Sequence, residues 1–151
     1  EFLHRRLFGA AMLPDAQVLA TVDHHLATLS VYADDGELIG IKNMGDSAGG
    51  FLSPDLFAPD CGHMREPGDY HNGGYWPMYT LVELALAYSI APEPRYRTVI
   101  EGLVQREMDQ GAGTEYWQLM PGSEGDIPPN RTFYSWNALI VPALRYAGLV
   151  Q

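Results

Sequence analysis

The chain has 151 residues, of which 46% are apolar and 19% charged, and its formal net charge is −10. This composition is typical of one soluble globular domain with a sizeable core, and it excludes a disordered chain. The excess of acidic residues argues against binding to a phosphate backbone, so no nucleic-acid partner is expected. No window offers the roughly 18 uninterrupted apolar residues of a membrane helix, so no membrane association is expected either.

Ligand-binding motifs for metals and nucleotides are missing from the sequence. There is no HExxH, no CxxC and no glycine-rich phosphate loop, so we expect neither a metal nor a cofactor. Cys61 is the only cysteine, which rules out a disulfide within the chain and favours a reducing, cytoplasmic compartment.

Two helices are predicted in the first two thirds of the chain. The first begins at Pro14-Asp15 and runs to about Leu29, because apolar residues recur along it at helical spacing. The second runs from Pro77, a favoured first helical position, to about Ile90. It is apolar on all sides, with Glu83 as its only formal charge, and such a helix is buried on most sides.

Two further helices are predicted towards the C-terminus. The third follows Pro94, is amphipathic and stops before Gly111. The fourth covers residues 133–147 and is again apolar on all sides, and Pro142 is expected to kink it. Residues 1–13 read as the tail of an earlier buried helix.

The helices therefore alternate between amphipathic and buried, which predicts an all-α, two-layer array of outer and inner helices. Two connections, residues 30–76 and 111–132, are much longer than usual, and long loops are often functional. Each leads into the N-terminal end of a predicted inner helix. If the inner helices are parallel, both loops meet at one rim of the molecule.

The stretch GDYHNGGYWPM, residues 68–78, gathers polar and aromatic side chains on a glycine-rich segment. The chemistry suits a sugar site, because aromatic rings pack against the C–H face of a pyranose while Asn, His and Asp bond its hydroxyl groups. The candidate sugar-binding residues here are Asp69, Tyr70, His71, Asn72 and Trp76. Alternatively, Asp69 caps a turn, and Tyr75, Trp76 and Pro77 simply fix the start of the helix.

The second long loop contains the segment TEYW, residues 114–117. Glu115 lies beside the aromatic residues Tyr116 and Trp117, and a carboxylate in such a place could act as a general base. The alternative interpretation is a solvated loop glutamate, which is the commoner environment for this residue type.

Both segments resemble known motifs. YHNGGYWP, residues 70–77, resembles the YHNGG-x-WP segment of neutral and alkaline invertases. More broadly it is similar to six-hairpin (α/α)6-barrel glycosidases, a group that includes glycogen-debranching-type glucosidases and trehalases. The stretch from Glu115 to Leu144, with EYW, PGSEG and FYSWNALIVPAL in that order, resembles the late segment of the same group.

The resemblance implies a glycoside hydrolase that acts on glucoside-type oligosaccharides. It places Glu115 where the group carries its catalytic base, which activates water in an inverting hydrolysis. It places Tyr70, His71, Asn72 and Trp76 in the sugar subsite, and Trp136 at the aromatic position that opens the last inner helix. The full set of residues predicted to bind the substrate also includes Asp69, Tyr116, Trp117 and Trp136. The chain departs from the group in two ways: YWQLMPG replaces an Asp-containing stretch, and no SG-x-D segment supplies the second carboxylate.

A ring of six helical hairpins needs more than 151 residues. The chain, residues 1–151, is therefore interpreted as a single partial domain: a partial (α/α) toroid with long rim loops, from the C-terminal part of a larger glycosidase. Such a fragment is expected to be inactive alone and to associate with itself or with the rest of the barrel. Two alternatives remain: a carbohydrate-binding or structural helical domain without catalysis, and an unrelated helical protein whose aromatic loops pack in its core.

Overall fold

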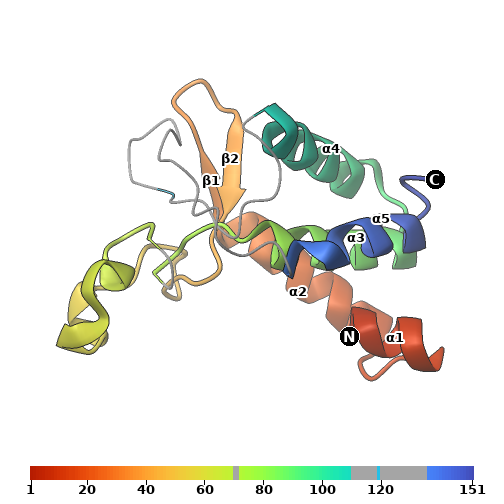
Figure 1. Ribbon diagram of the computed structural model, residues 1–151, viewed down its shortest axis with the longest axis horizontal. Helices are drawn as coiled ribbons and strands as arrows, with labels where there is room; N and C mark the ends of the chain where they lie inside the picture. The colour runs from red at the N-terminus through yellow and green to blue at the C-terminus, as the bar shows by residue number, and fades with distance from the viewer. Residues whose placement is uncertain (70–71, 110–118, 120–135) are drawn as a thin grey trace.

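The computed structural model describes residues 1–69, 72–109, 119 and 136–151, except for the side chains of residues 63–65, 136 and 137. Within these residues there are five α-helices, four of which pack around the fifth, central one, and a small antiparallel hairpin lies beside them (Figure 1). No helix in this part of the chain is both long enough and apolar enough to cross a membrane.

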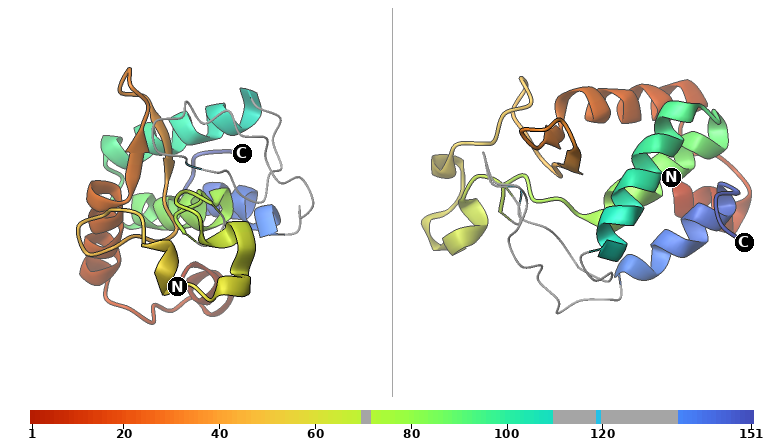
Figure 2. Two further views of the ribbon diagram at one scale, coloured as in Figure 1. Left: turned by 90° about the vertical axis from the view of Figure 1, so that its left-hand side faces the viewer. Right: turned by 90° about the horizontal axis from the view of Figure 1, so that it is seen from above.

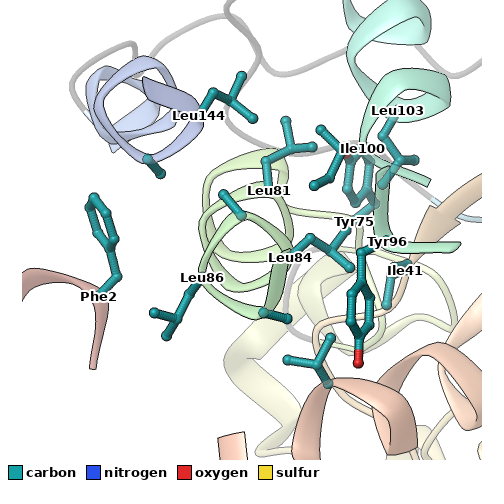
Figure 3. Packing of buried hydrophobic residues seen from close by; sticks show 14 of the residues in the cluster. Phe2, Ile41, Tyr75, Leu81, Leu84, Leu86, Tyr96, Ile100, Leu103 and Leu144 are labelled. Carbon is teal, nitrogen blue, oxygen red and sulfur yellow. The ribbon is translucent and has the colours of Figure 1, made fainter. Parts of the chain in front are cut away.

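The central helix is α3, Pro77–Ile90, and it confirms the helix predicted over these residues. It packs against α1, α2, α4 and α5. Figures 1 and 2 show α2 and α5 on opposite sides of α3, with α4 lying across it. Leu81, Leu84 and Leu86 point in different directions into this surrounding layer (Figure 3), which is why α3 carries apolar residues on every side.

The amphipathic helices α2, Asp15–Thr28, and α4, Pro94–Asp109, also confirm the sequence-based prediction. Each buries one face only, and α4 does so through Tyr96, Ile100 and Leu103. The two helices are joined at one end of α4. There the Tyr96 hydroxyl donates to Asp23 over 2.7 Å, and Arg95 forms an ion pair with the same carboxylate over 3.0 Å.

The C-terminal helix differs from the prediction. A 3-10 turn over Trp136–Leu139 precedes α5, which covers only Ile140–Tyr146. Pro142 therefore lies in the first turn of α5, where its missing N–H leaves no helical bond unmade, instead of kinking a longer helix. Only Ala143 and Leu144 of α5 are buried, so this helix packs one face on α3 and is not an inner helix. Residues 133–135 lie outside the described residues.

The prediction for residues 1–13 holds for the helix but not for its burial. The helix α1, Phe2–Phe8, ends at Gly9, which is in a left-handed conformation, and of its residues only Phe2 is buried. Phe2 points from α1 towards α5 (Figure 3), and its ring packs edge to face on that of Tyr146.

A hairpin contradicts the all-α fold and the partial (α/α) toroid. Strand β1, Ser30–Tyr32, pairs antiparallel with β2, Leu38–Ile41, inside the segment of residues 30–76 that was predicted as a long rim loop. The turn between them contains Asp35-Gly36, with Gly36 at φ 88°, a strong local signal for a hairpin. Ile39 and Ile41 are buried and β2 packs on α4, so the sheet belongs to the core and not to a rim.

The chain after β2 leaves the helices and returns to them. It forms two short 3-10 segments, Pro54–Leu56 and Pro59–Arg65, the second broken at Gly62. Figure 1 shows this part, coloured yellow, projecting to the side away from α1. The returning chain, residues 72–76, then runs beside β2 and enters α3.

Candidate functional site

Asn72 holds the projecting segment to the start of α3. Its side-chain amide is fully buried, donates to the Leu52 carbonyl over 2.8 Å and accepts from the Leu52 amide over 2.9 Å. This paired contact mimics one step of a sheet ladder. The predicted sugar-binding amide therefore bonds the backbone of the preceding loop in this structure.

The two glycines after Asn72 allow a close approach between segments. Gly73 has φ 92°, and a Cβ atom there would lie 2.7 Å from the Phe51 ring. The carbonyl of Gly74 accepts from the Asn43 amide over 3.0 Å, and Tyr75 forms a bridge with Lys42. Residues 74–75 thus extend the hairpin past the end of β2.

This extended pairing sends consecutive side chains to opposite sides. Tyr75 is fully buried in the core beside α4 (Figure 3). Burial raises the pKa of its phenol well above the ordinary value. Trp76, the next residue, turns to the other side, towards α2.

On that side lies a pocket of about 300 Å³ between the end of α2, the end of β2 and the first turns of α3. Trp76 and Tyr79 form its aromatic wall, with ring centroids 5.6 Å apart and planes tilted by 38°. Trp76 is only 7% exposed, whereas Tyr79 is 54% exposed. The pair therefore has one ring fixed by the core and one open to solvent. The other lining residues are His25, Leu29, Ile41, Lys42, Asn43, Thr80 and Glu83.

An acid–base pair crosses the pocket from α2 to α3. His25 Nδ1 and Glu83 Oε1 are 2.9 Å apart, and each side chain is about one third exposed. The hydrogen bond with Glu83 raises the pKa of His25, although burial opposes this effect. Glu83 is the only carboxylate that lines the pocket among the described residues.

Lys42, another lining residue of the pocket, directs its ammonium to the neighbouring loop. Its ammonium donates to the Gly49 carbonyl and lies 4.7 Å from the centre of the Phe51 ring. Burial lowers the pKa of Lys42, and the nearby Asp46 carboxylate partly offsets this. The lysine thereby fixes the loop of residues 46–51 against the end of β2.

The structure brings only some of the sequence-predicted residues together. Trp76 lines the pocket, and Asp69 is buried, with its carbonyl accepting from the Gly74 amide over 3.2 Å. Trp136 begins the 3-10 turn before α5, and its side chain is not among those described. The remaining predicted residues lie outside the described residues: Tyr70, His71, Glu115, Tyr116 and Trp117.

One described residue tests whether the two long loops meet. Leu119, from the second loop, is buried and donates its amide to the Gly68 carbonyl over 2.8 Å. At this point the second loop contacts the glycine-rich segment, four residues after Glu115 in the sequence.

Sequence analysis did not identify His25, Lys42, Tyr79 or Glu83 as site residues. For Glu83 a signal was present, because a single charge on an otherwise apolar helix needs a partner or a function. Among the described residues, no cluster of three or more His, Cys, Asp or Glu side chains could hold a metal ion. Comparisons with protein families, curated proteins and solved structures find no match for this chain.

Proposed function

We propose that the chain is the C-terminal part of a glycoside hydrolase, and that the pocket beside Trp76 binds a glucoside-type sugar. The observation that carries the proposal is the position of Trp76. It belongs to the segment that resembles a glycosidase motif, and it lines a pocket together with a second aromatic ring and several polar groups.

The pocket has the chemistry that a sugar needs. A pyranose presents C–H groups on its faces, which pack on aromatic rings, and hydroxyl groups at its edge, which need donors and acceptors. Trp76 and Tyr79 supply the rings, while the His25–Glu83 pair and Asn43 supply polar groups at the pocket wall. The volume of about 300 Å³ lies at the lower end of the range for small-molecule sites.

In this proposal Glu115 is the catalytic base. Its carboxylate takes a proton from water as the water attacks the anomeric carbon. The contact of Leu119 with Gly68 supports only the meeting of the two loops, because the Leu119 side chain lies beside Gly40 and Tyr75 and not among the residues that line the pocket.

Binding is the direct test. We expect calorimetry or NMR titration of the chain with maltose, isomaltose, sucrose and trehalose to detect at least one ligand. Tyr79→Ala should then lower the affinity for that sugar about tenfold or more, since the truncation of an aromatic side chain at a binding site often costs over ~1.4 kcal/mol of binding free energy.

Tyr32→Ala is the matched control, because Tyr32 is similarly exposed but lies on β1, away from the pocket. Equal affinities in both variants, or no binding of any sugar by the folded chain, would refute the sugar-site assignment.

A carbohydrate-binding domain without catalysis is the second candidate. It is favoured by one observation: the described part of the pocket holds a single carboxylate, and that carboxylate is paired with His25. Inverting hydrolysis needs two carboxylates roughly 6.5–9.5 Å apart. If a longer protein that includes this chain binds a sugar but releases no glucose from it, the carbohydrate-binding function is the correct one and the hydrolase function is refuted.

A further inference from the structure

A second pocket adjoins the first along the same helix. It has a volume of about 260 Å³ and lies between α1, α2 and α3. Tyr79 and Glu83 line both pockets, so the two share a boundary. The apolar residues of the second pocket are Phe2, Leu13, Val18, Met78, Val82 and Leu86.

The two pockets follow one another along the groove between α2 and α3. The first pocket is lined by the end of α2, at His25, and by the start of α3, at Trp76. The second pocket is lined by the beginning of α2, at Val18, and by the later part of α3, at Leu86. The helices are thus antiparallel across the groove, and one end of the groove is polar and aromatic whereas the other is apolar.

The spacing of residues on α3 produces this division. Met78, Val82 and Leu86 recur every four residues and form one apolar stripe, which faces the second pocket. Trp76, Thr80 and Glu83 form the neighbouring stripe, which faces the first pocket. Tyr79 lies between the stripes with a largely exposed ring, so a ligand can contact it from either pocket.

The outer wall of the apolar pocket is held by hydrogen bonds. The Glu1 carboxylate accepts from the backbone amides of Met12 and Leu13, each over 3.2 Å, and pairs with Arg5. Arg5 also pairs with Asp15 at the start of α2 over 2.7 Å. These contacts fix Leu13 beside the groove, so the pocket has a built wall on the side of α1.

We propose that the natural ligand is an amphipathic glycoside, with its sugar in the pocket beside Trp76 and its apolar alkyl or aryl aglycone in the pocket beside Val82. This inference rests on the proposed sugar site and extends it. The volume suits a short alkyl chain or one aromatic ring, since benzene already fills an apolar cavity of about 150 Å³ in another protein.

The test compares methyl and hexyl glucosides, in both anomers, as ligands of the chain. Each buried methylene should tighten binding up to about fourfold, from ~0.8 kcal/mol per methylene and ~1.4 kcal/mol per tenfold. We therefore expect hexyl glucoside to bind at least about tenfold tighter than methyl glucoside. Hexanol alone should bind far more weakly than hexyl glucoside.

Leu13→Glu places a charge at the wall of the apolar pocket. It should abolish most of the hexyl advantage and leave methyl glucoside affinity unchanged. Leu56→Glu is the matched control, because Leu56 is an exposed leucine outside both pockets, and it should change neither affinity.

The outcomes separate the two proposals. If methyl glucoside binds and hexyl glucoside binds no tighter, the aglycone pocket is refuted while the sugar site stands. If neither glucoside binds, the sugar site itself is refuted. If hexanol binds as tightly as hexyl glucoside, or if Leu13→Glu and Leu56→Glu behave alike, the apolar pocket is not part of a glycoside site.

Discussion

Glu83 is the only formal charge on α3, and the structure pairs it with His25 across the pocket. Both side chains are about one third exposed, so solvent screens the pair and its contribution to stability is small, about 0.2–1 kcal/mol. Because it spans two helices that line the proposed sugar site, its protonation state affects both stability and the polar groups offered to a ligand.

The stability contributed by this pair should depend on pH. The folded-state pKa of His25 is raised above the unfolded value of ~6.5, so the contribution is present below that pH and is lost as pH rises through the folded pKa. Urea unfolding of wild type and Glu83→Gln should therefore differ most near pH ~5.5, where Glu is still ionised, and converge near pH ~9.

Glu101→Gln is a suitable control, because Glu101 pairs with Arg97 on α4 and an arginine does not titrate in this range. Its effect should stay constant between those pH values. A constant difference for Glu83→Gln as well would show that His25 carries no pH-dependent stabilisation.

Glu115 carries the catalytic part of the proposed function, although it lies outside the described residues. In a longer, active protein that includes this chain, Glu115→Gln keeps the shape of the side chain and removes the base. Turnover of the bound glucoside should fall by ~10²–10⁴, with sugar affinity and unfolding midpoint retained. Steady-state kinetics with unchanged turnover would exclude Glu115 as the base.

At the scale of elements, the glycine-rich segment has a structural role that can be separated from ligand binding. Asn72, Gly73 and Gly74 join the projecting loop, β2 and the start of α3 through backbone contacts. The segment thereby fixes the direction in which Trp76 leaves the chain, and with it the aromatic wall of the pocket.

Gly73→Ala should destabilise the fold for two reasons. The residue has φ 92°, which is strained for any side chain, and the new Cβ would meet Phe51. We expect a loss of about 1–3 kcal/mol in unfolding free energy, the typical cost of a strained backbone position, measured by urea titration.

Gly36→Ala separates the two causes, because Gly36 has a similar φ of 88° and open space around its Cβ position. If the unfolding free energy falls more for Gly73→Ala than for Gly36→Ala, the contact of the new Cβ with Phe51 is the cause of the extra destabilisation. Equal losses would mean that Phe51 moves aside freely and that the close approach of the two segments is not required.

At the scale of the whole molecule, the end that contains α1 leaves several large apolar side chains exposed to solvent. Leu7 and Phe8 of α1 are 70% and 71% exposed, and Leu3, Met12 and Leu13 are also exposed nearby in the chain. This end lies opposite the projecting segment (Figure 1). Exposed apolar side chains gathered in one region often mark a surface for association.

We expect the chain to self-associate as its concentration rises, and we expect the double variant Leu7→Glu, Phe8→Glu to weaken this association. Sedimentation velocity over a concentration series measures the effect, with Leu56→Glu as a control for an exposed leucine on the projecting segment. A wild-type chain that remains monomeric at every concentration would contradict the prediction.

The sequence alone was sufficient to locate α2, α3 and α4 and to show that α3 is the most buried of them. Their apolar periodicity and the prolines at their starts are local properties, which each segment carries wherever it packs. The short hairpin was missed although Asp35-Gly36 marks its turn, because strands of three and four residues show too little alternation to stand out in a long connection.

Only the tertiary structure decided which faces became buried and which side chains became neighbours. The sequence of residues 133–147 is as apolar as that of α3, yet only Ala143 and Leu144 of α5 are buried, because among the described residues α5 packs mainly on one face of α3. His25 and Glu83 are far apart in the chain and form a pair only because α2 packs antiparallel on α3. A pocket is a property of two packed surfaces, so periodicity along one segment predicts its helices and not the cavity between them.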